Sequence, residues 1–472
     1  MAALSAAALA IPADALALDS FRRDGDPDDT LALKRAMERG RPIHVRAGRG
    51  GGAGGRYVVG MNEHDNLPQG LTMFGDGRDR SILHLAPGAP FILHGDSKSA
   101  DPARNLSGMR FSDLAFTDDV ARLGFSEYLY LVMLSGVSDA RFERVAFRGF
   151  RGDGLHLGSS TVSKIERHNV DVLVRDCVFD GVNSNNRNAI SIIDCDGLTV
   201  ERSKFLNCTR AGDGTANVGD PMNPLTGVAM PGPIDFEPNG DAFARIRRIV
   251  IRDNLFRGGG GYAVSLALVA NNRVTVPQSD ILITDNVIED RAGGVVATGY
   301  QGADAMKPGP GYGIRVVGNT IRHCARPFTF SGMKTVAVTG NVIADCTDRA
   351  EIGNIADVDD IVLRGNRFER IGSEIVPFAL WVRGSSGVRL IGNDFTDAGG
   401  PHGKEGTAVA FVGGVTRGVT MTGNSFAART RRMTKAVMVF RDGAVDPASL
   451  KVADNVVHFA APRIEDVLLR RA

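Results

Sequence analysis

The stretch RVVGNTIRHCARPFTFSGMKTVAVTGNVI, residues 315–343, contains one short phrase twice: Gly-Asn-Thr-Ile at Asn319 and Gly-Asn-Val-Ile at Asn341. In this phrase an Asn stands two places before an apolar residue, and the phrase occurs eight times along the chain. The eight asparagines are Asn254, Asn286, Asn319, Asn341, Asn366, Asn393, Asn424 and Asn455. The recurrence of one local pattern over half of the chain indicates a repeat architecture.

Related phrases that lack the Asn extend the series toward the N-terminus as far as Phe116. From Phe116 to Val457 the apolar residues of successive phrases lie 22 to 33 residues apart, with one longer interval of 51 residues between Phe205 and Phe256. A period of this size, built of short β-type runs between Gly, Asn and Asp, is typical of a β-solenoid with one coil per repeat.

A single coil cannot bury its own apolar face, so the coils are expected to stack ~4.8 Å apart and join their strands into parallel sheets. The residues predicted to point inward are Val250, Leu282, Val316, Val338 and Val362. Asn tolerates left-handed backbone geometry, which suits a sharp turn between sheets. The eight asparagines are therefore predicted to occupy one turn position and to form a hydrogen-bonded ladder along the axis.

The five cysteines follow the same repeat. Cys208, Cys324 and Cys346 each lie three places after the apolar residue of their phrase, which predicts one buried stack and leaves a Cys324–Cys346 disulfide open. Cys177 takes the turn-Asn position, and Cys195 stands outside both sets. The chain has no C-x-x-C spacing, so neither a zinc site nor a disulfide framework is expected.

Composition excludes several classes of function. The 55 basic and 54 acidic side chains give a net charge of +1, which argues against nucleic-acid binding through bulk charge. Hydrophobic residues make up 43% of the chain, enough for a large core, and no window of ~20 apolar residues predicts a membrane span.

The N-terminus contains an Ala-rich apolar run over residues 1–17 that ends in the cleavage-like triplet Ala15-Leu16-Ala17, without a basic n-region. We interpret it as the remnant of an export signal, which predicts a periplasmic or secreted protein. The alternative is an N-terminal segment that packs on the body. The expected organisation is one β-helix domain over residues 18–462, followed by a C-terminal cap or tail over 463–472.

The segment DGDPDDTLALKRAM, residues 24–37, predicts a helix that begins near Asp29 or Thr30 and closes the open end of the solenoid. Through this D-G-x-x-D-D-T-x-A opening and the Asn repeat, the sequence resembles the pectate-lyase superfamily, including its rhamnogalacturonase- and epimerase-like members. The resemblance covers roughly residues 19–460. It implies an all-β, single-stranded, right-handed parallel β-helix with an N-terminal capping helix, an architecture that phage tailspikes share.

What the resemblance implies for function is broader, because most relatives cut, epimerise or bind acidic or neutral polysaccharides. The Asn-Thr-Asp, Gly-His-Gly and Arg-Ile-Lys signatures of polygalacturonases are absent, and the basic and calcium-binding set of pectate lyases has no clear counterpart. Both of those specific activities are thereby disfavoured, and fold alone does not choose among the others.

The candidate site emerges when four strands are aligned through their inward apolar pairs: GDGLHLG (152–158), NAISIID (188–194), PIDFEPN (233–239) and YAVSLAL (262–268). This alignment places His156, Ser191, Asp235 and Ser265 in one outward column, with Glu237 on the same face. As i,i+2 residues of one strand, Asp235 and Glu237 are expected ~6–7 Å apart at Cβ. The 51-residue interval that leads into this strand predicts a long loop beside the site.

Two carboxylates at this separation suit glycosidic-bond cleavage, in which one stays protonated and the other attacks or activates water. Asp235 and Glu237 are therefore the predicted catalytic pair, with solvated surface, a turn cap or a calcium site as alternatives. The supporting or substrate-binding candidates are Asp153, His156, Arg187, Asn188, Asp194 and Trp381, the only tryptophan. No metal site is predicted.

The preferred function is a glycoside hydrolase or transglycosylase that acts on a polysaccharide or oligosaccharide without a cofactor. One alternative is a lyase for a uronate-containing glycan, in which Ca²⁺ or Arg187 neutralises the substrate carboxylate. The other is a solenoid that binds carbohydrate without catalysis. The predicted partner is a glycan, not a nucleic acid or a membrane, and a homo-oligomer is compatible with the sequence.

Overall fold

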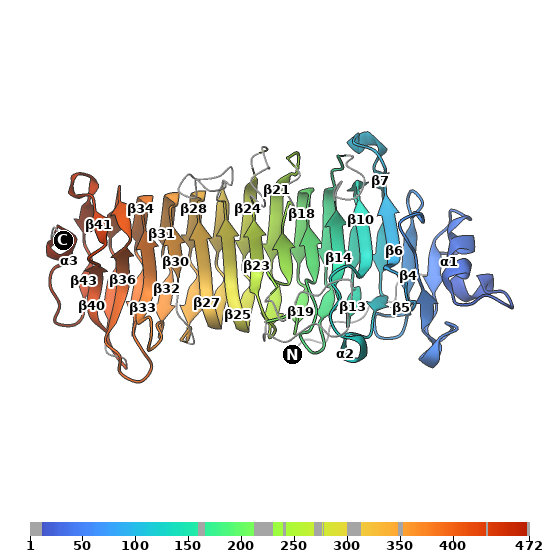
Figure 1. The fold of residues 1–472 in the computed structure, drawn as a ribbon, viewed down its shortest axis with the longest axis horizontal. Helices are drawn as coiled ribbons and strands as arrows, with labels where there is room; N and C mark the ends of the chain where they lie inside the picture. Colours follow the sequence, from blue (N-terminus) through green and yellow to red (C-terminus); the bar gives the residue numbers. More distant parts are fainter. Residues whose placement is uncertain are drawn as a thin grey trace.

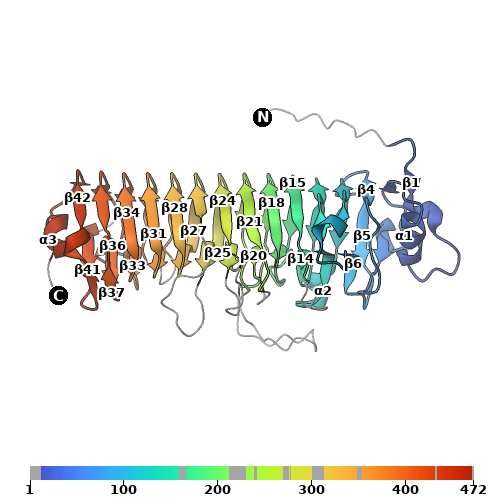
Figure 2. The same cartoon turned by 90° about the horizontal axis from the view of Figure 1, so that it is seen from above.

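The computed structural model describes residues 12–158, 166–211, 230–238, 242–268, 276, 278–299, 313–347, 353–430 and 433–469. The chain winds into an elongated stack of coils in which each coil adds one layer, and α1 and α3 lie at opposite ends (Figures 1 and 2). Every named strand pairing within the described residues is parallel, because successive coils run in the same direction.

One sheet runs the length of the stack through seventeen strands. They are β1 (Leu16–Ala17), β2 (Ile43–Val45), β4 (Thr72–Gly75), β7 (Leu106–Ser107), β8 (Arg110–Ser112), β11 (Val137–Ser138), β12 (Arg141–Glu143), β15 (Val170–Arg175), β18 (Cys195–Glu201), β21 (Ile246–Arg252), β24 (Ser279–Thr284), β26 (Ile314–Val317), β28 (Lys334–Thr339), β31 (Asp359–Arg364), β34 (Ser386–Ile391), β38 (Thr420–Thr422) and β42 (Lys451–Ala453).

The second sheet has twenty-four strands in two rows that share β25 and β27. The row that carries the repeat phrases consists of β3 (Tyr57–Val59), β5 (Ile82–Leu85), β9 (Ala115–Thr117), β13 (Ala146–Arg148), β16 (Val178–Asp180), β19 (Lys204–Leu206), β22 (Leu255–Arg257), β25 (Val287–Thr298), β27 (Thr320–Ser331), β29 (Val342–Ala344), β32 (Arg367–Glu369), β35 (Asp394–Thr396), β39 (Ser425–Ala427) and β43 (Val456–Val457). The row that carries the candidate site adds β6 (Phe91–Asp96), β10 (Tyr130–Ser135), β14 (Asp153–Gly158), β17 (Ile190–Ile192), β20 (Ile234–Phe236), β23 (Tyr262–Ala267), β30 (Asn354–Ala356), β33 (Phe378–Arg383), β36 (Gly406–Val412) and β40 (Met433–Val439).

The predicted register is confirmed by columns of like residues. Phe147, Phe179, Phe205 and Phe256 pair from coil to coil, and their rings stack with centroids 4.6 to 4.9 Å apart. Inward side chains from all coils form one continuous core along the axis. The stack is thus held together by repeated contacts between neighbouring coils.

The asparagine ladder is also confirmed. Nδ2 of Asn319 donates to Oδ1 of Asn341 at 3.0 Å, and Nδ2 of Asn341 donates to Oδ1 of Asn366 at 3.0 Å. The same bond links every successive pair from Asn254 to Asn455.

The backbone conformation at this turn differs from the prediction, because the left-handed residue is the one before each Asn. Gly318 and Gly340 have φ of 65° and 64°, and Asp253 has φ of 56°. The left-handed residue makes the turn, so the Asn side chain can hydrogen-bond to the Asn of the next coil.

Three of the predicted inward residues point outward. Val250, Leu282 and Val362 are only half-buried, and their neighbours Ile249, Ile281 and Ile361 face the core instead. Their strands are apolar at consecutive positions, so alternation alone does not choose the face, and a shift of one residue reverses it. Val316 and Val338 point inward as predicted.

The cysteine predictions are confirmed. All five cysteines are buried and free, so the open question of a Cys324–Cys346 disulfide is answered in the negative. Cys177 occupies the turn position: its backbone N–H donates to Ser203, whose own N–H donates to Asn254.

The N-terminal end is covered by α1 (Thr30–Met37), which buries Ala32, Leu33, Ala36 and Met37 against the first coils and confirms the capping helix. The carboxylate of Asp29 accepts backbone N–H bonds from Gly51 and Val58 instead of capping the helix. In β1, Leu16 and Ala17 pair with β2, so the end of the cleavage-like triplet lies against the first coil. Residues 1–11 lie outside the described residues.

The other helical segments are short: η1 (Leu18–Phe21), η2 (Ala53–Gly55), η3 (Pro102–Arg104), α2 (Val120–Leu123), η5 (Pro447–Ser449) and α3 (Ile464–Leu469). None of the helices that the structure describes is long and apolar enough to cross a membrane. A separate two-stranded pairing joins β37 (Gly414–Thr416) to β41 (Gly443–Val445).

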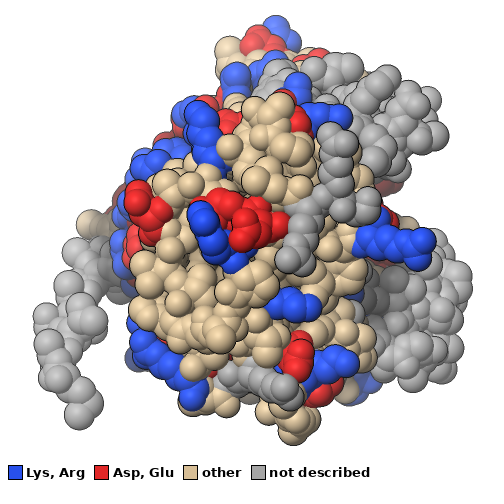
Figure 3. All heavy atoms as spheres, turned by 90° about the vertical axis from the view of Figure 1, so that its left-hand side faces the viewer, with Lys and Arg blue, Asp and Glu red and all other residues tan. Residues whose placement is uncertain are grey.

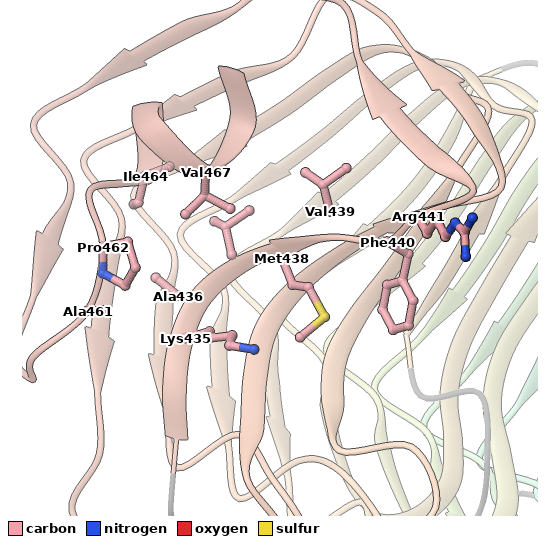
Figure 4. A pocket seen from close by; sticks show the side chains of 11 residues that line it. Lys435, Ala436, Met438, Val439, Phe440, Arg441, Ala461, Pro462, Ile464 and Val467 are labelled. Atoms are coloured by element: carbon pink, nitrogen blue, oxygen red, sulfur yellow. The ribbon is translucent and has the colours of Figure 1, made fainter. Parts of the chain in front are cut away.

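The C-terminal end presents mainly uncharged residues, among which acidic and basic side chains lie in small groups (Figure 3). There α3 lies over β40, and a cavity of about 440 Å³ opens between them, with Met438, Phe440, Ile464 and Val467 in its lining (Figure 4). This cavity lies many coils away from Asp235, so it is not part of the candidate site.

Candidate active site

The outward column is formed as predicted. Strands β14, β17, β20 and β23 align His156 with Ser191, Ser191 with Asp235, and Asp235 with Ser265. The flanking apolar residues, such as Ile234 and Phe236 in β20, are fully buried in the core. The outward direction of Asp235 therefore follows from the inward packing of its two neighbours.

Asp235 is nevertheless buried, with 1% of its surface exposed, whereas the side chain of Glu237 is 33% exposed. The predicted pair is thus asymmetric: only Glu237 reaches solvent. Other polar side chains cover Asp235, and one of them, Asn188, donates from Nδ2 to Oδ2 of Asp235 at 3.2 Å.

Arg187 connects the acids of the site. Its Nη1 donates to Oδ2 of Asp153 at 3.1 Å and to Oγ of Ser191 at 3.0 Å. Its Nη2 donates to Oε2 of Glu237 at 3.2 Å, and its Nε lies 3.7 Å from Oε1 of Glu127. The guanidinium is therefore surrounded by three carboxylates of the protein itself.

His156 belongs to the same cluster. Its Nδ1 lies 2.9 Å from Oδ2 of Asp153, and its ring stacks on Tyr130 with centroids 4.6 Å apart. Tyr130 pairs with Asp153 in the register of β10 and β14. The imidazole of His156 is therefore held by the Tyr130 ring of the preceding coil and by the Asp153 carboxylate of its own strand.

The environment separates the pKa values of two buried carboxyls. Burial, opposed by Arg187 and reinforced by Glu237, raises the pKa of Asp235 to about 7. Burial also acts to raise the pKa of Asp153, but its ion pair with Arg187 and its contact with His156 outweigh that effect and lower it. Asp153 is therefore the ionised partner of Arg187, and Asp235 carries a proton up to neutral pH.

Three buried polar atoms of this cluster have no hydrogen-bond partner among the described residues. They are Oδ1 of Asp235, Oδ1 of Asn188 and Nε of Arg187. Buried polar atoms are normally satisfied, so these atoms mark a place where hydrogen-bond partners are missing among the described residues.

Two of the predicted supporting residues lie apart from this cluster. Oδ2 of Asp194 lies 2.9 Å from Nδ1 of His168, which also contacts Glu166, and Asp194 accepts from the backbone of Asn169 and Arg245. Asp194 thus ties the start of β15 to the turn before β18. The turn after β17 directs its side chain toward that sheet and away from Asp235.

Trp381 lies in the same outward column as Asp235, several coils away, through the register of β20, β23, β25, β27, β30 and β33. It packs against Phe378 and Phe440, with centroids 5.9 and 6.0 Å away. The shared column is as predicted, but the position belongs to an apolar cluster near the C-terminal end.

Glu127 and Tyr130 were not identified from the sequence. Tyr130 lies opposite Asp153, so extension of the strand alignment by one coil would have found it. Glu127 precedes β10 in a connection that carries no repeat signal. Most of the long insertion before β20 falls at 212–229, outside the described residues, as do Asn239 and Gly240 of the expected turn.

Within the described ranges, no group of three or more His, Cys, Asp or Glu side chains has the arrangement to hold a metal ion.

No protein-family model matches the sequence, and no curated protein matches it. Solved structures do match. The chain is similar to tailspike protein 3 of bacteriophage CBA120, with 14% identity, 93% of this chain and 61% of that chain covered, and a TM-score of 0.58. A tailspike mutant of E. coli bacteriophage HK620 in complex with a pentasaccharide gives 14% identity, coverage of 93% and 80%, and a TM-score of 0.57.

The A-module of a mannuronan C-5 epimerase from Azotobacter vinelandii gives 15% identity, coverage of 95% and 100%, and a TM-score of 0.55. The chain thus spans about three fifths of the length of the CBA120 tailspike and the whole length of the epimerase module. These similarities show the fold alone: a right-handed parallel β-helix, as the sequence resemblance implied.

Proposed function

We propose that this protein cleaves glycosidic bonds of a polysaccharide or oligosaccharide, as a glycoside hydrolase or transglycosylase. Asp235 is the general acid, and Glu237 is the nucleophile or general base. The observation that carries the proposal is the pairing of a buried carboxyl with a pKa of about 7 and a partly exposed carboxylate on the same strand face. The pentasaccharide in the HK620 tailspike mutant supports a glycan ligand for this kind of scaffold.

The two carboxyls divide the chemistry. Asp235 donates its proton to the glycosidic oxygen as the bond to the anomeric carbon breaks. Glu237, held by Nη2 of Arg187, either attacks the anomeric carbon or takes a proton from the attacking water. Oδ1 of Asp235 is covered in the free protein, so the proposal requires that substrate binding uncovers this atom.

Arg187 and Asp153 act as positioning residues. The guanidinium bridges Asp153 and Glu237, so it fixes the position of the Glu237 carboxylate relative to β14, the strand that carries Asp153. A carboxylate that is held in one geometry loses less entropy when the reaction begins. Asn188 holds Oδ2 of Asp235 in the same way.

The test is turnover on a broad glycan panel with product mass analysis, using the full chain. Hydrolysis adds one water to the summed fragment mass, whereas elimination adds none and creates a double bond that absorbs in the ultraviolet. We expect hydrolytic or transglycosylation products, and losses of about 10²-fold or more in Asp235→Asn and Glu237→Gln. The matched control is Asp290→Asn, which removes an exposed carboxylate on β25 and should retain turnover.

Full turnover in both site variants would refute the assignment of the pair. An unsaturated product would establish the lyase alternative. Binding of a glycan without turnover would establish the non-catalytic alternative.

A further inference from the structure

The charges around Asp235 do not favour an acidic sugar. Arg187 is the cation of the cluster, and its three nitrogens already face Asp153, Glu237 and Glu127 at 3.1, 3.2 and 3.7 Å. The remaining basic group, His156, contacts Asp153 as well. Even with His156 protonated, the described residues of the cluster carry more negative than positive charge.

Arg187 is not available to a ligand carboxylate. Its side chain is 11% exposed, and the side chain of Asp153 is not exposed at all. If the guanidinium turned toward a substrate, Asp153 would be left as a buried charge without its partner, which is strongly unfavourable. A uronate would therefore meet the exposed carboxylate of Glu237, and the described residues of this cluster leave no cation to pair with it.

The unsatisfied atoms point to the kind of group that fits instead. Oδ1 of Asn188 is an acceptor, and Oδ1 of Asp235 belongs to a carboxyl that carries a proton up to neutral pH; both atoms are buried, and neither has a hydrogen-bond partner among the described residues. The side chains are joined through the other oxygen of Asp235, at 3.2 Å from Nδ2 of Asn188. A ligand at this place must bring a hydrogen-bond donor for Asn188 and an acceptor for the proton of Asp235; a sugar hydroxyl supplies both, whereas a carboxylate supplies only an acceptor.

We infer that the subsite at Asp235 binds a neutral or amino sugar, with a hydroxyl or amino donor to Asn188, and that it excludes a uronate. The inference rests on the proposed function and narrows its substrate class. It separates the protein from lyases and epimerases, whose substrates carry the carboxylate at the reacting ring.

The first experiment compares matched polymers on the full chain. Each uronate-containing polysaccharide of a panel is assayed beside its carboxyl-reduced form, which keeps the linkage and replaces the carboxylate with a primary alcohol. We expect cleavage of neutral members or of carboxyl-reduced forms. Cleavage of a uronate polymer that is lost on carboxyl reduction would overturn the inference.

The second experiment measures binding without turnover. Ligand-observed NMR at pH 5.5 compares methyl glucoside, methyl glucuronide and the iminosugar 1-deoxynojirimycin, whose ring nitrogen is protonated at this pH. We expect the iminosugar to bind about tenfold or more tightly than the glucuronide, and this gap to shrink in Glu237→Gln because one negative charge is removed. Asp290→Asn is the control and should leave the gap unchanged. Equal binding of the three probes, or tighter binding of the glucuronide, would overturn the inference.

The two proposals fail in different ways. A uronate polymer that is cleaved only when Asp235 is intact would refute the substrate class and retain the function. A neutral glycan that is cleaved equally by wild type, Asp235→Asn and Glu237→Gln would refute the catalytic pair, while the NMR probes still report on the subsite.

Discussion

Nη1 of Arg187 lies 3.1 Å from Oδ2 of Asp153, in an ion pair of which 11% of one side chain and none of the other is exposed. This pair joins β14 to the segment that enters β17 and places the guanidinium where it also binds Glu237. The geometry of the exposed carboxylate therefore depends on a charge pair buried one coil away.

Removal of the buried partner should destabilise the protein strongly. We expect Asp153→Ala to lower the free energy of unfolding by about 3–5 kcal/mol, because Arg187 would keep a buried charge without its main partner. The midpoint of urea unfolding measures the effect. Asp290→Asn, at an exposed acid paired with His323, should change stability by less than about 0.5 kcal/mol because Asn tolerates the left-handed backbone of this position, and equal losses in the two variants would contradict this account.

The pH dependence of turnover should reflect the proton of Asp235. Its pKa is raised to about 7 by burial, so the acid form dominates below pH 7 and is lost above it. We expect kcat to fall about tenfold per pH unit on the alkaline side of that value. The measurement is a kcat–pH profile on the best panel substrate, and a profile that stays flat to pH 9 would exclude Asp235 as the acid.

Stability should depend on pH in a related way. The pKa of Asp235 is about 7 in the folded protein against an ordinary value of 3.8, so the folded state binds more protons between these values. Its contribution to stability is full below pH 4 and declines as pH rises to 7. Asp235→Asn lacks this decline, so its stability relative to wild type should rise between pH 4 and pH 8, by about 1.4 kcal/mol for each unit of pKa difference.

Parallel urea titrations of both proteins at pH 4 and pH 8 test this expectation. A difference in stability that is the same at the two pH values would show that Asp235 does not titrate within this range.

The asparagine ladder should stabilise the interior of the stack more than its end. Asn341 donates to Val316 and Asn366 and accepts from Asn319, whereas Asn455 ends the ladder. We expect Asn341→Ala to cost about 2–4 kcal/mol, because buried groups on both neighbouring coils lose partners, and Asn455→Ala to cost about half as much. The midpoints of urea unfolding of the two variants measure both losses of stability. A larger loss in Asn455→Ala than in Asn341→Ala would contradict this expectation.

Most of the fold can be predicted from the sequence because each coil repeats the same pattern of turn residues and core residues. Asn341 and Phe256 occur at fixed phases of the period, so their columns follow from spacing alone. Val250, Leu282 and Val362 were assigned to the wrong face because their strands are apolar at successive positions and the polar partner that would mark the outer face is missing.

The candidate site was only partly readable. The column of His156, Ser191, Asp235 and Ser265 followed from aligned inward pairs, and the structure reproduces it. Asp194 was placed beside Asp235 by proximity along the strand, but the turn after β17 carries its side chain to His168.

The sequence by itself determined the period of the coils, and with it which residues stack on which, because backbone hydrogen bonding between coils forces equal phases into register. Only the tertiary structure decided which of the two paired acids is kept from water and how Arg187 is shared among Asp153, Glu237 and Glu127. Register specifies where a Cβ atom lies. Burial and charge pairing depend instead on the contacts that long side chains make above the sheet, and these side chains come from different coils and from connections without a repeat.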